Sequence, residues 1–423
     1  MTIDITAEPK IITQDREQLA YLLTEAAEIE HGLMCCYLFA AYSLKRDDDS
    51  LEANERAAIA RWRAAIISVA VEEMLHLAIV SNLLTAIGFA PQFTRPNFPV
   101  APGYHPSGIV VALAPFSAAT LDHFVFLERP EGVSILDGAG FDPPPYHQRA
   151  TRSDRLMPTS EDYATVGHLY RGIRAGFTSL SETLGQTSLF LGDPRAQVGP
   201  EILALAGLTA VTDLETACGA IDTIVEQGEG THTDSARSHY RRFLAVRTEY
   251  SALRAARPAF EPALPVAHNP VMRPPPDPHR KVHVDEPRAA RVIDLGNAIY
   301  GHTLRLLAHA FGRADDPPAA RRALVDASID LMSTLSSVAE MLCRMPANAA
   351  YPGVNAGLSF AVARSIAGPQ QLAIWPLLVE RTSEIAASAA DAANVIDPAL
   401  AATAVRLQDV ASRLRNASPV SIV

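Results

Sequence analysis

The pair Glu73 and His76 constrains this chain most, because both residues lie in an otherwise apolar segment, residues 66–80. In a helix the two side chains are one turn apart on a face of isoleucine, valine, alanine and leucine. Burying a charge without a partner is costly, so both groups need one. A bound cation is such a partner, and Glu-x-x-His projecting into a bundle core is the spacing of carboxylate-bridged dimetal proteins. The pair therefore predicts a helical bundle with a buried metal site.

A second helix is predicted upstream, over residues 18–44, where apolar residues recur at helical spacing. Glu30 falls inside this apolar stripe, flanked one turn away by Ala26 and Met34. One inward glutamate on the first helix and Glu-x-x-His on the second form half of a dimetal ligand set. Tyr37 lies two turns beyond Glu30 on the same face, and we predict that it is a redox or hydrogen-bonding neighbour of the site. The alternative is a core tyrosine with a satisfied hydroxyl.

Composition limits the classes of partner. The 423 residues carry a formal net charge of -11 and no basic run, which argues against a nucleic-acid surface or a patch for anionic membranes. The amino-terminal residues lack the basic start and apolar core of a signal peptide. No stretch of about 18 uncharged apolar residues occurs, so we expect no membrane span and a cytoplasmic protein.

The order of patterns along the chain predicts an all-α fold in three parts. Residues 13–256 form a helical bundle, interrupted by a loop-rich insertion at residues 89–158 with many prolines and glycines. Residues 257–287 are a proline-rich linker in an extended conformation. Residues 288–416 form a further helical unit, for which the periodicity predicts packing only.

The second half of the ligand set is sought in the later helices of the bundle. Glu229 continues the apolar stripe of the helix before it, whereas Glu226 points off that stripe, so Glu229 is the better candidate. His239 shares a face with apolar residues of the next helix. His168 is the candidate that the helix around Tyr170 offers. It lies about 200° around that helix from Tyr170, which is on the apolar face. The predicted metal ligands are Glu30, Glu73, His76, Glu229, His239 and His168.

Several segments together resemble a known family. They are residues 22–31 with Tyr37 and Leu38, residues 72–77, residues 82–88 with 95–99, and residues 224–230 with His239 and Tyr240. These resemble the ferritin-like iminophenyl-pyruvate dimer synthase domain of the violacein and rebeccamycin pigment enzymes. The resemblance implies a ferritin-like four-helix bundle, and an activity that couples two imines made from an amino acid by a partner flavin oxidase. Two departures are that this chain matches only the ferritin-like part of those longer enzymes, and that His168 stands where the family pattern has a glutamate.

Mixed carboxylate and imidazole ligation suits iron, with manganese as an alternative, and one or two ions are compatible with the ligand set. The leading functional hypothesis is a metal-dependent oxidase or oxygenase that uses dioxygen on a small amino-acid-derived metabolite in natural-product biosynthesis. The first alternative is imine coupling of the dimer-synthase type. The second is a non-catalytic ferritin-like scaffold, in which Glu30 and Glu73 pair with Arg171 or Arg174 rather than with metal.

Overall fold

The computed structural model describes residues 10–46, 48–101, 103–105, 109–141, 156–159, 161–228, 237–362 and 373–419. Its centre is a hairpin of two long helices, α1 (Arg16–Ser43) and α2 (Ala53–Ala86). Asp15 begins α1 by accepting a hydrogen bond from the Gln18 amide at 2.8 Å, and Glu55 accepts one from the Glu52 amide at the start of α2, also at 2.8 Å. Gly88 follows α2 with φ +92°, a conformation that glycine adopts without steric cost.

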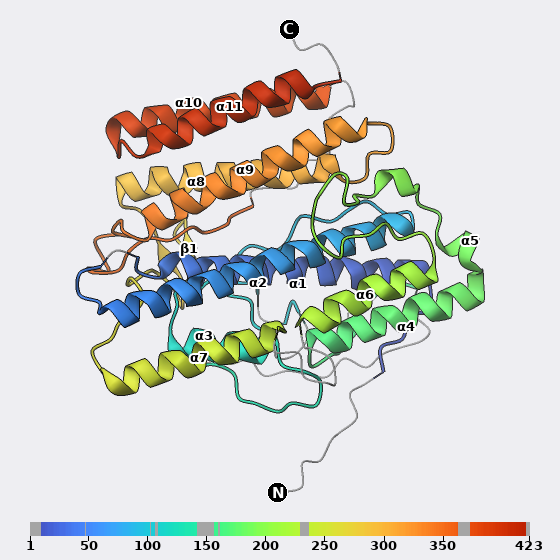
Figure 1. The fold of residues 1–423 in the computed structure, drawn as a ribbon, viewed down its shortest axis with the longest axis horizontal. Helices are drawn as coiled ribbons and strands as arrows, with labels where there is room; N and C mark the ends of the chain where they lie inside the picture. Colours follow the sequence, from blue (N-terminus) through green and yellow to red (C-terminus); the bar gives the residue numbers. More distant parts are fainter. Residues whose placement is uncertain are drawn as a thin grey trace, which may run out of the picture.

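Two pairs of shorter helices cover one side of the central hairpin (Figure 1). One pair is α3 (Ala118–Leu127) with α7 (His239–Ala256), and the other is α4 (Val166–Leu184) with α6 (Leu214–Gly228). The helix α3 lies inside the predicted loop-rich insertion. A short helix α5 (Gln186–Leu189) and a 3₁₀ turn η1 (Pro194–Ala196) follow α4. We call α3, α4, α6 and α7 the interrupted helices, because these four shorter helices cover the side of the hairpin that two continuous helices cover in a four-helix bundle.

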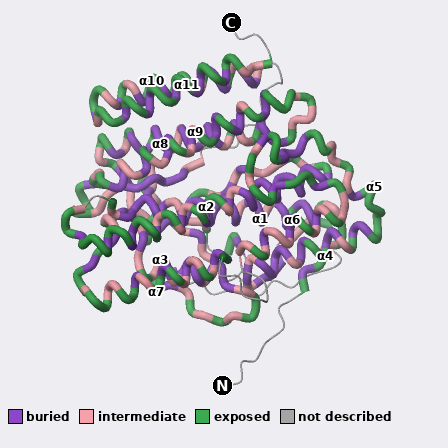
Figure 2. The backbone as a smooth tube through the Cα atoms, in the orientation of Figure 1, coloured by how far each residue is buried: buried purple, intermediate pink, exposed green. Residues whose placement is uncertain are grey.

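The other side of the hairpin is covered by the carboxy-terminal helices. The helices α8 (Pro287–Ala310) and α9 (Pro318–Leu342) pack as a hairpin next to α1, and α10 (Ile374–Val395) and α11 (Leu400–Ala417) form the outermost layer (Figure 1). Purple, buried backbone dominates α1 and much of α2, whereas α10 and α11 alternate between buried and exposed turns (Figure 2). The all-α prediction is confirmed.

The proline-rich segment is bound to the bundle by backbone hydrogen bonds. Leu264 donates to the Ser43 carbonyl and Asn269 to the Leu113 carbonyl, at 2.8 and 2.9 Å. A two-residue parallel ladder joins β1 (Pro270–Val271) to β2 (Val282–His283). Extended chain held in this way connects α7 to α8. The domain boundaries proposed from the sequence remain predictions.

The helix α2 has the length and apolar composition of a membrane span, with a mean hydropathy of 1.7 over an 18-residue window. However, 61% of that window is buried inside the protein. Burial of this kind is what the central helix of a bundle requires, so the apolar run is explained by packing against its neighbours.

Candidate metal centre

Glu30, Glu73 and His76 meet in the core between α1 and α2, and each is only 2% exposed. The Nδ1 atom of His76 lies 3.2 Å from Glu30 Oε2 and 3.1 Å from Glu73 Oε2. The spacing of three residues places Glu73 and His76 on one face of α2, and that face meets Glu30 across the hairpin. We call these three residues the His76 half of the site.

A second group of donors shares Glu73. The Nδ1 atom of His239 lies 2.9 Å from Glu73 Oε1 and 3.5 Å from Glu128 Oε2, and His239 is fully buried. The two imidazole rings stack with centroids 5.4 Å apart. We call Glu73, Glu128 and His239 the His239 half. Because the two oxygens of Glu73 face different imidazoles, this carboxylate is placed to bridge two neighbouring cation positions.

Each half has one carboxylate that is not shared, Glu30 in the His76 half and Glu128 in the His239 half, and we call these two the outer carboxylates. A tyrosine hydroxyl holds each of them. Tyr170 donates a hydrogen bond to Glu30 Oε1 at 2.5 Å, and Tyr37 donates one to Glu128 Oε1. The Tyr37 ring also packs against Phe124 and Phe243, with centroids 4.7 and 4.9 Å away. These hydroxyls occupy one oxygen of each carboxylate, and the other oxygen faces the imidazole Nδ1 of its own half.

The outward-facing Nε2 atoms of the two histidines have different partners. His76 Nε2 lies 2.9 Å from the Gln227 side-chain oxygen, and His239 Nε2 lies 3.1 Å from Glu72 Oε2. Glu72 in turn pairs with Arg242. Because an acceptor at Nε2 fixes the proton there, Nδ1 of each ring is the nitrogen free to bind a cation.

The site lies where the shorter helices end. Glu128 directly follows α3, His239 is the first residue of α7, and Gln227 is in the last turn of α6. A cavity of about 20 Å³ opens here, enough for a water molecule or an ion. It is lined by both outer carboxylates, Glu73, His76 and Tyr170, and by residues from the ends of α3, α4 and α6.

Burial makes the charges of this cluster interdependent. Burial first, and the neighbouring Glu73 carboxylate second, raise the pKa of Glu30 to about 8. For His76, burial opposes the charged form, but the carboxylates of Glu73 and Glu30 outweigh it and raise its pKa to about 10. For Glu73, burial is outweighed chiefly by His239, and the pKa falls well below its usual range. Three buried carboxylates therefore require positive charge, supplied by protons or by a cation.

The donor set fits a metal centre. Three carboxylates and two imidazoles, all buried, form two groups whose donor atoms lie within 4.8 Å of one another. Among the described residues, His239 Nδ1 has no hydrogen-bond partner, although Glu73 is 2.9 Å away. A buried nitrogen directed between two carboxylates without a hydrogen bond is the arrangement expected of a ligand. Oxygen and imidazole donors of this kind bind divalent first-row metals, and they do not select one of them.

The structure brings together most of the residues proposed from the sequence. Glu30, Glu73, His76 and His239 form the two halves, and Tyr37 touches Glu128. Glu229 lies outside the described residues, and Glu226 is exposed. His168 is buried in the first turn of α4 and belongs to neither donor group. Its role as a ligand remains a prediction that the observed groups do not support.

Residue roles that the sequence interpretation missed come mainly from the interrupted helices. Glu128, Tyr170 and Gln227 were not proposed, although Tyr170 continues an apolar stripe and so could have been recognised as inward-facing. Glu128 follows Phe124 and Leu127, which is too short a pattern to indicate its direction. The suggested pairing of Glu30 and Glu73 with arginines is wrong, because Arg171 pairs with Glu131 and Arg174 with Asp222.

Comparison with known proteins places these residues in context. The Ferritin-like family profile matches residues 23–248, which include all five donors. A crystal structure of a ferritin-like protein from Caulobacter vibrioides superposes with a TM-score of 0.50 at 20% identity, covering 83% of this chain and all of that one. At that identity the likeness concerns the fold alone.

Two enzymes are similar in sequence. Dichlorochromopyrrolate synthase of Lentzea aerocolonigenes is 28% identical over 385 residues, which are 82% of this chain and 36% of that enzyme. The 2-imino-3-(indol-3-yl)propanoate dimerase of Chromobacterium violaceum is 29% identical over 350 residues, 76% of this chain and 32% of that enzyme. The chain thus spans about a third of the length of these relatives.

Proposed function

We propose, from the premise that this chain belongs to the ferritin-like family, that it joins two 2-imino carboxylates derived from an amino acid, on a pair of metal ions. The observation that carries the proposal is the two-half donor cluster sharing Glu73, in a chain of which 76% is similar to an imine dimerase. These relatives favour the coupling alternative over the oxidase or oxygenase hypothesis.

The residues that would hold the ions are those of the two halves. His76 and Glu30 would bind one ion, His239 and Glu128 the other, and Glu73 both. When bound, such ions polarise a ligand oxygen or nitrogen and accept electrons. Tyr170 and Tyr37 keep the outer carboxylates in position, while Gln227 and Glu72 orient the rings. The surrounding apolar side chains limit the access of water, which strengthens the electrostatic interactions inside.

The coupling is an oxidation and needs an electron acceptor. Each imine loses one hydrogen atom from carbon, a carbon–carbon bond forms between the two molecules, and two protons and two electrons leave. Dioxygen is the acceptor that we propose, and it would be reduced to hydrogen peroxide. Because the cavity of about 20 Å³ is too small for two such substrates, the cavity must widen when they bind.

The test supplies the imine in situ from tryptophan and a flavin amino-acid oxidase, which is also the partner class that we propose for the pathway. Protein loaded with iron(II) is incubated in air, and the coupled product is detected by its mass. We expect product from the native protein, and none from Glu73→Ala. The matched control is Glu226→Ala, which changes an exposed residue of α6 outside both halves. Full coupling by Glu73→Ala would exclude this centre from the reaction.

A further inference from the structure

The two halves of the site are built from the same kinds of group around each imidazole Nδ1. Each has an imidazole Nδ1, an outer carboxylate held by a tyrosine, and one oxygen of Glu73. The acceptors behind the rings, at Nε2, differ in charge. There His76 meets the neutral amide of Gln227 at 2.9 Å, whereas His239 meets the carboxylate of Glu72 at 3.1 Å.

An anionic acceptor changes the ring that donates to it. A carboxylate at Nε2–H draws the proton outward and increases electron density at Nδ1, so the ring becomes a stronger ligand. An amide oxygen does this less, because it carries only a partial charge. Arg242 pairs with Glu72 and also contacts Ser68, so it reduces the effect of the Glu72 charge without removing it.

The cavity supplies an independent difference between the halves. Its lining includes His76, Glu30, Glu73 and Glu128, but not His239. His239 is fully buried, and its outward nitrogen is covered by Glu72. The cavity therefore reaches the imidazole of the His76 half and not that of the His239 half.

From these two observations we propose that Glu72 makes the two metal positions unequal. The His239 half binds its ion more tightly and stabilises the higher oxidation state, whereas the His76 half holds the exchangeable ion that meets the imino carboxylate. Glu72 is a positioning residue, since it acts through His239. This inference rests on the proposed metal centre and assigns a separate task to each half.

Two matched substitutions remove the difference from opposite directions. Glu72→Gln gives both rings an amide acceptor, and Gln227→Glu gives both a carboxylate, with little change in side-chain size. Chelator-treated protein is titrated calorimetrically with cobalt(II), and the iron-loaded protein is titrated potentiometrically. In native protein we expect two separate binding steps and two potentials. In Glu72→Gln the tighter step weakens about 10–100-fold, toward the other. In Gln227→Glu the weaker step strengthens.

A third variant separates an electronic role of Glu72 from a purely structural one. Arg242→Gln removes the cation that offsets the Glu72 charge, so an electronic role predicts that the tighter step stays the same or strengthens. A structural role of the Glu72–Arg242 pair predicts that both variants weaken it.

Three outcomes would overturn the inference. Equal weakening of the tighter step by Glu72→Gln and Arg242→Gln would do so, as would two equal steps in native protein that Glu72→Gln leaves unchanged. In both cases the proposed function would stand, because the protein still binds two ions. Absence of any cobalt or iron binding to native protein would overturn the inference and the proposed centre together.

Discussion

The continuous helices and the interrupted helices of the bundle contribute to the same site in different ways. The helices α1 and α2, of 28 and 34 residues, carry Glu30, Glu73 and His76 in their interiors, where helical spacing fixes the direction of each side chain. The interrupted helices contribute at their ends, with Glu128 after α3 and His239 at the start of α7. The interior ligands give the site rigidity, and the helix ends give it a cavity.

The largest expected effect is at the residue on the continuous hairpin that both halves share. Glu73→Ala removes a ligand from each cation position and leaves two buried imidazoles without their common partner. We expect metal content to fall from two ions per chain to none, measured by mass spectrometry after purification without chelator. Retention of one ion would show that Glu73 belongs to one half only.

Substitution of one outer carboxylate at a time tests whether the two kinds of helix supply separate halves. Glu128→Ala should remove the ion next to His239, and Glu30→Ala the ion next to His76, with the remaining ion bound within about tenfold of its native affinity. Cobalt(II) titrations of the two variants provide each other's control. If Glu128→Ala removes both ions, the interrupted helices are as essential to the site as the continuous ones.

The pH dependence follows from the two raised pKa values on the continuous hairpin. The folded pKa of Glu30, about 8 against 4.5, means that its protonated form stabilises the metal-free fold fully below pH 4.5, and this contribution is lost as the pH rises through 8. His76, at about 10 against 6.5, stabilises the metal-free fold below pH 6.5 and ceases to do so as the pH rises through 10. Metal binding displaces these protons, so metal affinity should rise over the same range.

Thermal unfolding with and without chelator checks this sign. Between about pH 6 and pH 9 the metal-free protein should lose stability, while the stabilisation by added metal should grow. Parallel curves for the two forms would mean that metal does not replace these protons.

The two tyrosines allow the same substitution to be compared on a continuous and on an interrupted helix, since Tyr37 is on α1 and Tyr170 is on α4. Tyr37→Phe frees Glu128 and Tyr170→Phe frees Glu30, each without changing ring packing. Each should lower the affinity of one ion by about tenfold, toward the lower limit for an outer partner of a ligand. Calorimetric titration of each variant with cobalt(II) would show whether one step changes. A change in the wrong step would mean that the carboxylates are assigned to the wrong halves.

The same contrast explains what could be predicted from the sequence. Helices α1 and α2 are long, and their apolar period places Glu30, Glu73 and His76 inward without knowledge of the fold. The all-α class follows from the same periodicity. Glu128 could not be found in this way, because α3 has 10 residues and its direction depends on packing against α7. His239 was found from the face that it shares with Phe243. The sequence does not show that His239 and His76 share Glu73, because that contact depends on how α7 packs against α2.

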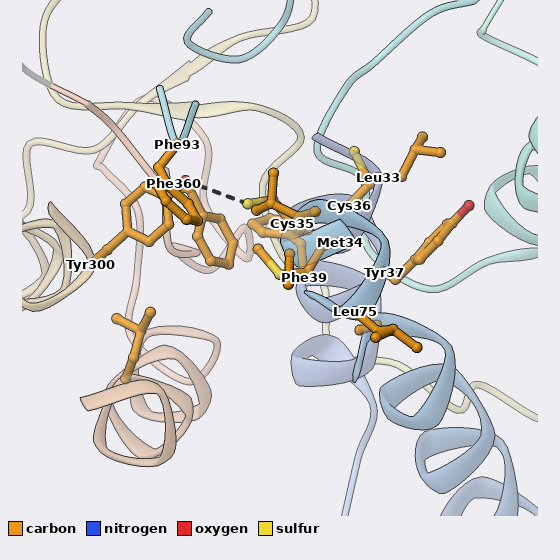
Figure 3. Packing of buried hydrophobic residues seen from close by; sticks show 14 of the residues in the cluster. Leu33, Met34, Cys35, Cys36, Tyr37, Phe39, Leu75, Phe93, Tyr300 and Phe360 are labelled. Carbon is orange, nitrogen blue, oxygen red and sulfur yellow. Dashed lines mark hydrogen bonds between the residues drawn. The ribbon is translucent and has the colours of Figure 1, made fainter. Parts of the chain in front are cut away.

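The smallest effect on the metal centre is expected at the junction between α1 and the carboxy-terminal helices. Tyr300 of α8 contacts His31 Nε2 at 2.7 Å and accepts from Arg95 at 2.9 Å, and it lies on the side of α1 away from Tyr37 (Figure 3). Tyr300→Phe removes both contacts and should destabilise the fold by about 1–3 kcal/mol, measured by urea unfolding. Metal content should stay at the native value, because neither half touches this network. A loss of metal would instead show that α8 and α9 determine the position of α1 closely enough to hold Glu30 against Glu73, and the carboxy-terminal helices would then be part of the centre.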